Sequence, residues 1–172
     1  MSKMLVVNST RDQEWLEIQL ATIWYKYFSD VEQKNKVQIR YGRKAKRRLG
    51  SIGLDPLDRH SSIISINPIY QDEHVPEYVV YATIIHEMIH YAHGFNSPHT
   101  QKQRHPHSGG VIRKEFAQRG LEDIYLKQDS WLKANWPSII TKYFDSNPKY
   151  LRQNTSIAKK SSLQAPWWIR IR

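Results

Sequence analysis

Residues 86–90 of the chain are His-Glu-Met-Ile-His, a spacing that could bind a metal ion. His86 and His90 are four residues apart, so on an α-helix their imidazoles project from one side, about one turn from each other. Two imidazoles placed in this way can bind one Zn²⁺, and Glu87 would face the side of the metal where a water molecule sits. The neighbouring residues are apolar, and burying this polar group without partners would be costly. The pattern therefore predicts a metal site with a carboxylate base.

Two helical ligands leave a zinc site incomplete, so a third ligand must come from another segment. One arrangement continues with a glycine three residues after the second histidine and a histidine six residues after it. This chain has His93 and Asn96 at those positions, so that arrangement is excluded. Side chains further along the chain that could complete the site are Glu115, Glu122, His99, His105 and His107.

Among these candidates we favour His107. It stands directly before Ser108-Gly109-Gly110 and a helix that we predict over residues 111–126. A histidine at the mouth of that helix can be brought back against the first one. His99 and His105 would then be solvated loop residues, although His105, Glu115 and Glu122 stay open as alternative third ligands.

The residues around the histidine pair predict the helix that carries it. Pro76 suits a first helical turn, Glu77 suits the positive end of the helix dipole, and Gly94 is a natural C-terminal cap. Four apolar residues repeat at spacings of four, four and three, as a buried helix face does: Val80, Ile84, Met88 and Tyr91.

Two elements should precede this helix and support it. An apolar stripe from Leu16 to Phe28 predicts an N-terminal helix that packs on the core. Residues 62–67 predict an apolar strand, which Pro68 ends. Such a strand, at the edge of a small sheet, could pair with an extended peptide and hold it across the metal.

The segment 34–48 is strongly basic: eight of its fifteen residues are Lys or Arg and none is acidic. Alternating apolar residues predict a strand over 37–41, and 46–52 could return as its hairpin partner. A cationic hairpin could be a plain solvated face, or it could release counterions from DNA on binding. The candidate nucleic-acid contacts are Arg43, Lys44, Lys46, Arg47 and Arg48.

The C-terminal part should contain a further helix, capped by Ser130 and interrupted by Pro137, and then a tail over 146–172. The tail has six basic residues and no acidic ones. It could anchor on an apolar patch, lie in the peptide cleft, or bind single-stranded nucleic acid by stacking and phosphate contacts. We favour the last, through Trp167, Trp168, Arg170 and Arg172.

The totals indicate one globular domain, which we place at residues 1–145, followed by the tail 146–172. The chain has no cysteine, which leaves histidine and carboxylates as its strong metal ligands. No run is long enough for a signal peptide or a membrane span, so we expect a cytoplasmic protein without a membrane partner. The net charge of +10 favours a polyanionic partner, and DNA binding would associate the protein with the nucleoid.

Over residues 11–125 the chain resembles a SprT-like metalloprotease domain, the family that includes Spartan. The resemblance lies in the Ile-rich segment ending in Asn67-Pro68, the HEMIH motif, His107, and the Phe-Ala-Gln-Arg-Gly segment at 116–120. It implies a zincin-like α+β fold, three histidine zinc ligands and Glu87 as the base. It also implies protein substrates that are crosslinked to DNA.

Taken together, these patterns predict an α+β, zincin-like domain: an N-terminal helix, a small antiparallel or mixed sheet, the metal helix and C-terminal helices. The predicted function is a zinc-dependent endopeptidase, with Zn²⁺ held by His86, His90 and His107 and with Glu87 as general base. The alternative is a nucleic-acid-binding protein whose zinc is structural or vestigial. A third hypothesis keeps the peptidase but gives it a specific partner, or its own tail, as the target.

Overall fold

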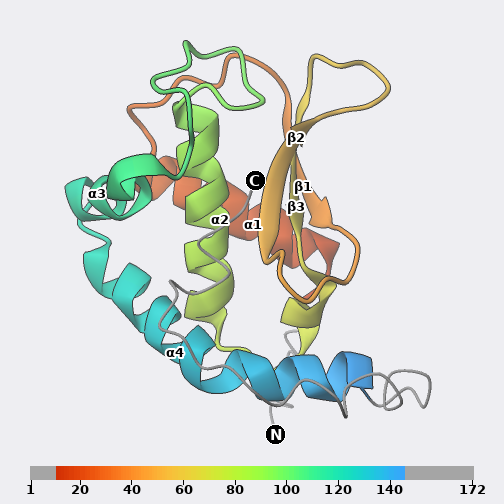
Figure 1. Cartoon of the computed structure of the whole chain (residues 1–172). Helices are drawn as coiled ribbons and strands as arrows, with labels where there is room; N and C mark the ends of the chain where they lie inside the picture. Colours follow the sequence, from red (N-terminus) through yellow and green to blue (C-terminus); the bar gives the residue numbers. More distant parts are fainter. Residues whose placement is uncertain (1–10, 146–172) are drawn as a thin grey trace, which may run out of the picture.

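The structure is a computed structural model that describes residues 11–145 of the 172-residue chain. Its main elements are α1 (Gln13–Tyr27), β1 (Val37–Tyr41), β2 (Gly50–Leu54), β3 (Ser62–Ile66), α2 (Glu77–Ala92), α3 (Val111–Gln118) and α4 (Glu122–Ile140). Two 3-10 helices, Pro68–Gln71 and Ser108–Gly110, and a π-helix, Thr141–Asp145, complete the described part. Four α-helices and one small sheet confirm the predicted α+β class for this part of the chain (Figure 1).

The sheet is mixed and has the strand order β1-β3-β2. Because β1 pairs in parallel with β3, and β2 pairs antiparallel with the other side of β3, the predicted hairpin between 37–41 and 46–52 is wrong. The prediction that 62–67 is an edge strand is wrong too. Four of the five β3 residues are buried, and a strand that must be covered so fully is best placed in the centre of the sheet.

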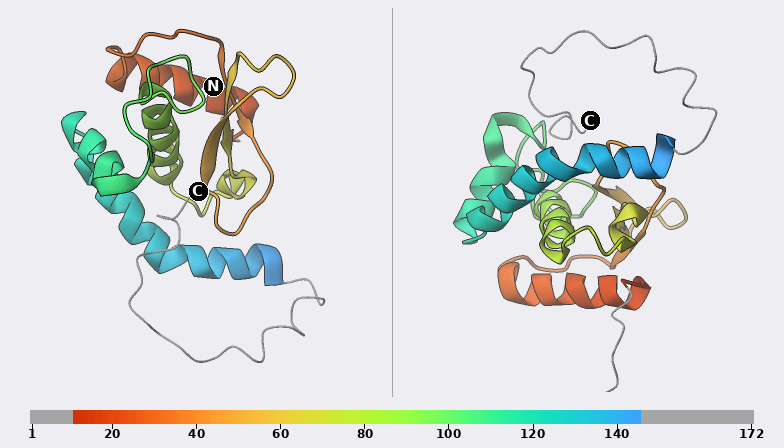
Figure 2. Two further views of the ribbon diagram at one scale, coloured as in Figure 1. Left: turned by 45° about the horizontal axis from the view of Figure 1, so that its top comes forward. Right: turned by 90° about the horizontal axis from the view of Figure 1, so that it is seen from below.

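Helix α1 supports the sheet as its apolar stripe predicts. Leu16, Leu20 and Ile23 are buried on its inner side. The helix begins after Asp12, whose side chain accepts a hydrogen bond of 2.8 Å from the Trp15 backbone N–H. Figure 2 shows α1 and α4 on opposite sides of the layer that α2 and the sheet form.

Helix α2 lies in the middle of the molecule, and twelve of its sixteen residues are buried. It begins directly after Pro76 and ends before His93 and Gly94, as predicted. Gly94 has a φ of 81°, which is a left-handed conformation that favours glycine, and the Phe95 N–H then donates to the His90 carbonyl at 3.0 Å. This turn starts the loop that leads to His107.

The C-terminal helices differ from the prediction in where they break. Gly120 has a φ of 71° and separates α3 from α4, so the helix predicted over 111–126 is two helices. Helix α4 then runs on through Ser130, which is therefore not a cap. Pro137 lies inside α4 and does not end it, but the ribbon changes direction along the helix, as a proline requires (Figure 1).

The far end of α4 is tied to the segment between β1 and β2. The Trp136 side chain is fully buried, and its indole N–H donates to the Lys46 carbonyl at 3.0 Å. Its ring meets Tyr70 edge-on at a centroid distance of 5.8 Å. Among the described residues, no helix is long and apolar enough to cross a membrane.

Candidate metal centre

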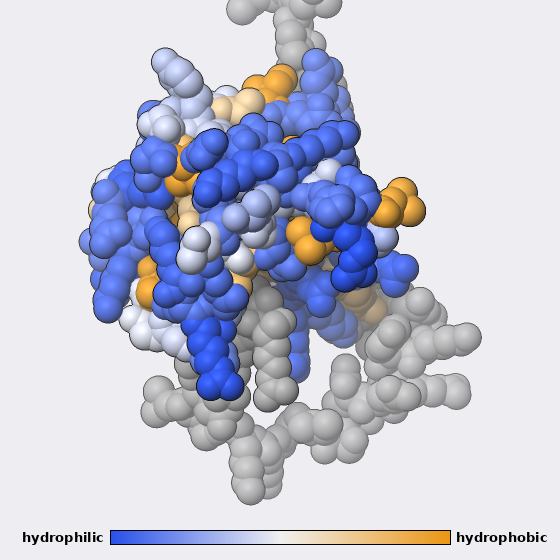
Figure 3. Space-filling view, turned by 90° about the horizontal axis from the view of Figure 1, so that it is seen from above, coloured by the Kyte–Doolittle hydropathy of each residue, from blue (hydrophilic) through white to orange (hydrophobic). Residues whose placement is uncertain are grey.

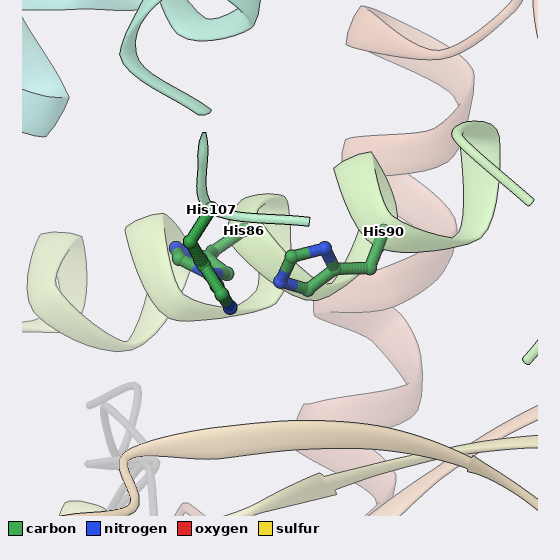
Figure 4. Close-up of side chains that lie close together, drawn as sticks. All are labelled: His86, His90 and His107. Atoms are coloured by element: carbon green, nitrogen blue, oxygen red, sulfur yellow. The ribbon is translucent and has the colours of Figure 1, made fainter. Parts of the chain in front are cut away.

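Three histidines meet on one side of α2. His86 and His90 project from the helix, and His107 reaches them from the loop in front of α3 (Figure 4). One potential ligand atom from each ring lies within 4.8 Å of those of the other two. The ring centroids are 4.8 Å apart for His86 and His90, 5.3 Å for His86 and His107, and 4.7 Å for His90 and His107. This cluster could hold a metal ion.

The loop that delivers His107 is fastened to α2 and to the N-terminal part of the chain. Ser97 Oγ donates to the Tyr91 carbonyl at 2.7 Å, and the Lys102 N–H donates to the His93 carbonyl at 3.1 Å. His99 Nε2 lies 2.9 Å from the Glu32 carbonyl oxygen. Beyond His107, two glycines with positive φ turn the chain into α3. The loop is thus held at several points before it reaches the cluster.

The protonation of the cluster fits a metal site. Burial, and then the neighbouring rings His90 and His107, hold the pKa of His86 well below its ordinary value. Burial also lowers the pKa of His90, to about 3, and that of His107. All three rings are therefore neutral at pH 7, which is the form of imidazole that binds metals.

The hydrogen bonding of the cluster gives the second test of fit. His86 Nε2 and His90 Nδ1 are buried and have no hydrogen-bond partner among the described residues. An unpaired buried polar atom costs about 1–3 kcal/mol. A cation bound among the three rings would satisfy whichever of these nitrogens faces it, so the residues present suit a metal ion.

Glu87 is buried beside the cluster, with 3% of its surface exposed. Burial raises its pKa to about 8, and the positive charge of Arg48 opposes this shift. No other described residue makes a hydrogen bond with its carboxyl group. On its other side it meets Gly50 of β2, where an added Cβ would lie only 2.7 Å from Glu87 Oε1.

The other candidate ligands lie elsewhere in the structure. Glu115 Oε1 pairs with Arg119 at 2.9 Å, and its Oε2 lies 3.2 Å from His93 Nε2, without hydrogen-bond geometry. Glu122 pairs with Arg113 at 2.8 Å. Neither they nor His99 and His105 belong to the cluster. Of the five candidates, only His107 is brought to His86 and His90.

An edge of the sheet runs along the cluster. The Asn67 N–H donates to the Leu49 carbonyl, and the Asp55 N–H donates to the Ser61 carbonyl. In an antiparallel pair, every second residue directs its N–H and C=O groups toward the partner strand. The backbone groups of Gly50, Ile52 and Leu54 therefore point away from β3. No described strand pairs with this edge. The side chain of Asn96 donates to the Ile52 carbonyl at 3.0 Å. The groove along this edge is also lined by Glu87, His90 and His107.

A smaller, more enclosed space lies on the other side of the cluster. It has a volume of about 100 Å³ and is walled by α2, α3 and α4. Its lining includes His86, Glu87 and His107 together with apolar side chains, chiefly Leu49, Ile112 and Leu132. The sequence alone did not indicate this cavity, because it forms where three helices meet.

The residues predicted to bind nucleic acid fall into three groups. The ammonium groups of Lys44 and Lys46 lie over the rings of Tyr143 and Phe144, 4.8 and 5.3 Å from their centroids. Arg43 and Arg48 line a groove together with Arg40, and Arg47 is exposed. The residues predicted in the tail lie outside the described part of the chain: Trp167, Trp168, Arg170 and Arg172.

Comparisons of the chain with family models, curated proteins and solved structures found no match. The function therefore has to be argued from the site. It consists of three neutral imidazoles, a buried carboxyl group beside them and an open strand edge along the same groove.

Proposed function

We propose that the protein is a zinc-dependent endopeptidase. The observation that carries this proposal is the position of Glu87: it is buried beside His86, faces a groove that contains two of the three histidines, and has no hydrogen-bond partner among the described residues. A site that only held a structural metal would not need a buried carboxyl group in this place. The resemblance to SprT-like domains supports the same assignment.

His86, His90 and His107 would hold the ion. When bound, zinc supplies a Lewis acid that lowers the pKa of a water molecule and polarises a peptide carbonyl group. Three protein ligands leave a fourth position open, as in catalytic rather than structural zinc sites.

In this proposal Glu87 carries the proton during cleavage. Its carboxylate accepts a proton from the attacking water and gives it to the leaving amine. Burial raises the pKa of Glu87 to about 8 in the absence of a metal ion, and a cation held by the neighbouring histidines would favour the carboxylate that accepts the proton. Arg48, whose charge acts on Glu87, favours the ionised form in which the carboxylate starts.

The free edge of β2 would hold the substrate. The outward backbone groups of Gly50 and Leu54 can hydrogen-bond an extended polypeptide, as in other cases of strand addition. A peptide on this edge passes Glu87, His90 and His107, since all of them line the same groove. In this proposal the substrate pairs with β2, whereas the sequence had suggested that it pairs with the strand 62–67.

The excess of positive charge supports proteins bound or crosslinked to DNA as the substrates. The alternative is a nucleic-acid-binding protein with a structural zinc. The basic residues favour this alternative as much as they favour a DNA-associated peptidase, so the two must be separated by the role of Glu87.

The deciding experiment measures cleavage of casein and histones by the full-length protein, with and without DNA and with a chelator. Glu87→Gln should keep about one zinc per chain and lose cleavage by at least about 10²-fold, as the loss of a general base does. His107→Ala should lose zinc, and His105→Ala is its matched control because His105 lies in the same loop outside the cluster. Full activity of Glu87→Gln would sink the peptidase assignment, and full zinc in His107→Ala would remove this residue from the ligand set.

A further inference from the structure

The cavity beside His86 offers an apolar surface and almost no free polar group. Outside the histidine cluster and Glu87, four of its polar lining side chains contact another residue: Thr83, Gln128, Arg113 and Asp129. The fifth, Tyr125, makes no hydrogen bond through its hydroxyl group with another described residue. Gln128 donates to the Val79 carbonyl at 3.0 Å and to Thr83 Oγ1 at 2.9 Å. Arg113 pairs with Glu122 at 2.8 Å, and Asp129 pairs with Lys133 at 2.6 Å. A ligand in this cavity should therefore be apolar.

The size of the cavity limits which apolar group can enter. At about 100 Å³ it is smaller than the engineered protein cavities of about 150 Å³ that take up benzene. A branched aliphatic side chain, such as that of leucine, fits better than an aromatic ring. Figure 3 shows the molecule from the side of the loop that carries His107; this face is mainly hydrophilic, with separate hydrophobic residues.

The groove on the His90 side has the opposite character. Two guanidinium groups line it, Arg40 from β1 and Arg48 from the segment before β2, and its only acidic lining residue is Glu87. Both arginines are exposed, and neither forms an ion pair with another residue of the described part. The adjoining groove contains the same two arginines together with Arg43, and no acidic residue. The groove therefore suits an anionic group.

The cavity and the groove meet at the cluster and share Gly50, Glu87 and His107. The cavity extends on the His86 side and the groove on the His90 side, one helical turn apart. An extended chain on the edge of β2 would reach both. An anion in this groove is therefore more simply part of the polypeptide being cut than a separate nucleic acid.

We propose that the metal cleft selects polypeptides that place an aliphatic side chain in the cavity and an acidic side chain against Arg40 and Arg48, on opposite sides of the reacting bond. This inference rests on the proposed peptidase function and names the substrate class of the same site. The aliphatic side chain would sit beside the bond that is cut, because His86 and Glu87 form one wall of the cavity.

The first test measures kcat/KM of the full-length zinc protein on peptides that carry one residue of varied size and one of varied charge. The residue of varied size is Ala, Leu or Phe. The residue of varied charge is Asp or Lys, and it stands two to four positions before or after the first one. We expect peptides with Leu and Asp to be cleaved at least tenfold faster than those with Leu and Lys or with Ala and Asp. Equal rates across the series would overturn the inference.

Two pairs of variants locate the selectivity. Leu132→Phe fills the cavity and should shift preference from Leu toward Ala, whereas Leu126→Phe, on the exposed side of the same helix, should not. Arg40→Glu should reverse the preference from Asp to Lys. Its control is Lys36→Glu, which makes the same charge change near the same strand but outside this groove. Unchanged preferences in both Leu132→Phe and Arg40→Glu would contradict the inference.

A second measurement needs no catalysis. Methyl NMR of the full-length protein is recorded during titration with N-acetyl-leucine amide or with the α-amide of N-acetyl-aspartic acid. The leucine probe should shift the methyl signals of Ile112 and Leu132, and the aspartate probe should not. The absence of a shift with leucine, or equal shifts with both probes, would overturn the aliphatic site. If the protein cleaves no peptide at all, the proposed function fails, and this titration decides on the cavity by itself.

Discussion

Gly50 controls how closely β2 can approach the carboxyl group of Glu87. Any other residue at position 50 would direct a Cβ to within 2.7 Å of Glu87 Oε1 and 2.8 Å of Thr83 Cγ2. Because both of these side chains are buried, neither can move away freely. The glycine therefore keeps the Glu87 carboxyl group in place between the strand and the helix.

We expect Gly50→Ala to retain zinc but to cleave about 10²-fold more slowly, because a displacement of roughly 1 Å in a reacting group can cost that much. Gly53→Ala is the control, since it lies in the same strand and its added Cβ would meet nothing within 4 Å. Zinc content and kcat are measured for both variants. If both lose activity equally, the contact with Glu87 is not the cause.

The sequence predicted the histidines and the glutamate of the site better than it predicted the residues that pack around them. His86, Glu87 and His90 are neighbours in the chain, so helical geometry was enough to bring them together. His107 could be chosen because Ser108-Gly109-Gly110 leads from it directly into the next predicted helix. Gly50 could not be found in this way, since its contact depends on the pairing of β2 with β3 and on the packing of β2 against α2.

The helix α3 is held by a chain of ion pairs that starts at Glu115. This carboxylate lies between His93, at the end of α2, and Arg119, whose guanidinium continues to Asp30 at 2.8 Å and covers the Phe28 ring at 4.0 Å. The pKa of Glu115 is lowered to about 2, mainly by its contact with His93; burial opposes this shift, and Arg119 adds to it.

A depressed carboxyl pKa stabilises the fold above the unfolded value, and the effect is lost as the pH falls through the folded value. Glu115 should therefore stabilise the protein above about pH 4.5 and lose this contribution between about 4.5 and 2. Glu115→Gln should lower the free energy of unfolding at pH 7 by on the order of 1 kcal/mol, once solvent screening is allowed for. The difference from the wild type should shrink toward pH 2.

Urea unfolding at pH 7 and pH 3 measures this difference. His86, His90 and His107 are common to both proteins, so their protonation cancels in the comparison. Glu122→Gln is the control, because the Arg113–Glu122 pair is about half exposed on both sides and should contribute little. A difference that stays constant from pH 7 to pH 3 would exclude the ionised Glu115 as its source.

The elements were predicted well where the pattern was local and poorly where it was not. The start and end of α2 follow from Pro76 and Gly94, which act on their own neighbours. The order of the strands could not be predicted, because residues 37–41 alternate as a strand does and residues 46–52 follow them after Gly42, as the second strand of a hairpin would. The burial of β3 decided between the two topologies, and burial depends on the whole fold.

The charge of the whole molecule is +10, but its cations are not equivalent. Lys44 and Lys46 lie over aromatic rings of the π-helix Thr141–Asp145 that follows α4, whereas Arg43 and Arg47 are exposed and make no ion pair with other described residues. This difference separates two roles within one basic segment. The lysines would fasten the segment to the helix, and the arginines would face a polyanion.

We therefore expect the double change of Arg43 and Arg47 to Gln to weaken DNA binding and to reduce the slope of log affinity against log salt by about 1.4 to 1.8. The matched double change of Lys44 and Lys46 to Gln should alter this slope less. It should instead lower the stability by on the order of 1 kcal/mol, from the lost cation–π contacts. Fluorescence titrations at several salt concentrations and urea unfolding measure the two effects. An equal loss of slope in both variants would show that the aromatic rings do not withhold the lysines from DNA.

The central position of β3 has a consequence for the order of folding. The antiparallel partner β2 precedes it by a short turn, residues 55–61, so this pair closes a small loop. The parallel partner β1 is separated from β3 by residues 42–61, which include β2. Pairing β1 with β3 therefore closes a longer loop, at a higher cost in entropy. We expect the β2–β3 pair to form early and β1 to be added later, together with α1, which packs against it. The strand edge along the histidine cluster would thus belong to the part of the molecule that forms first.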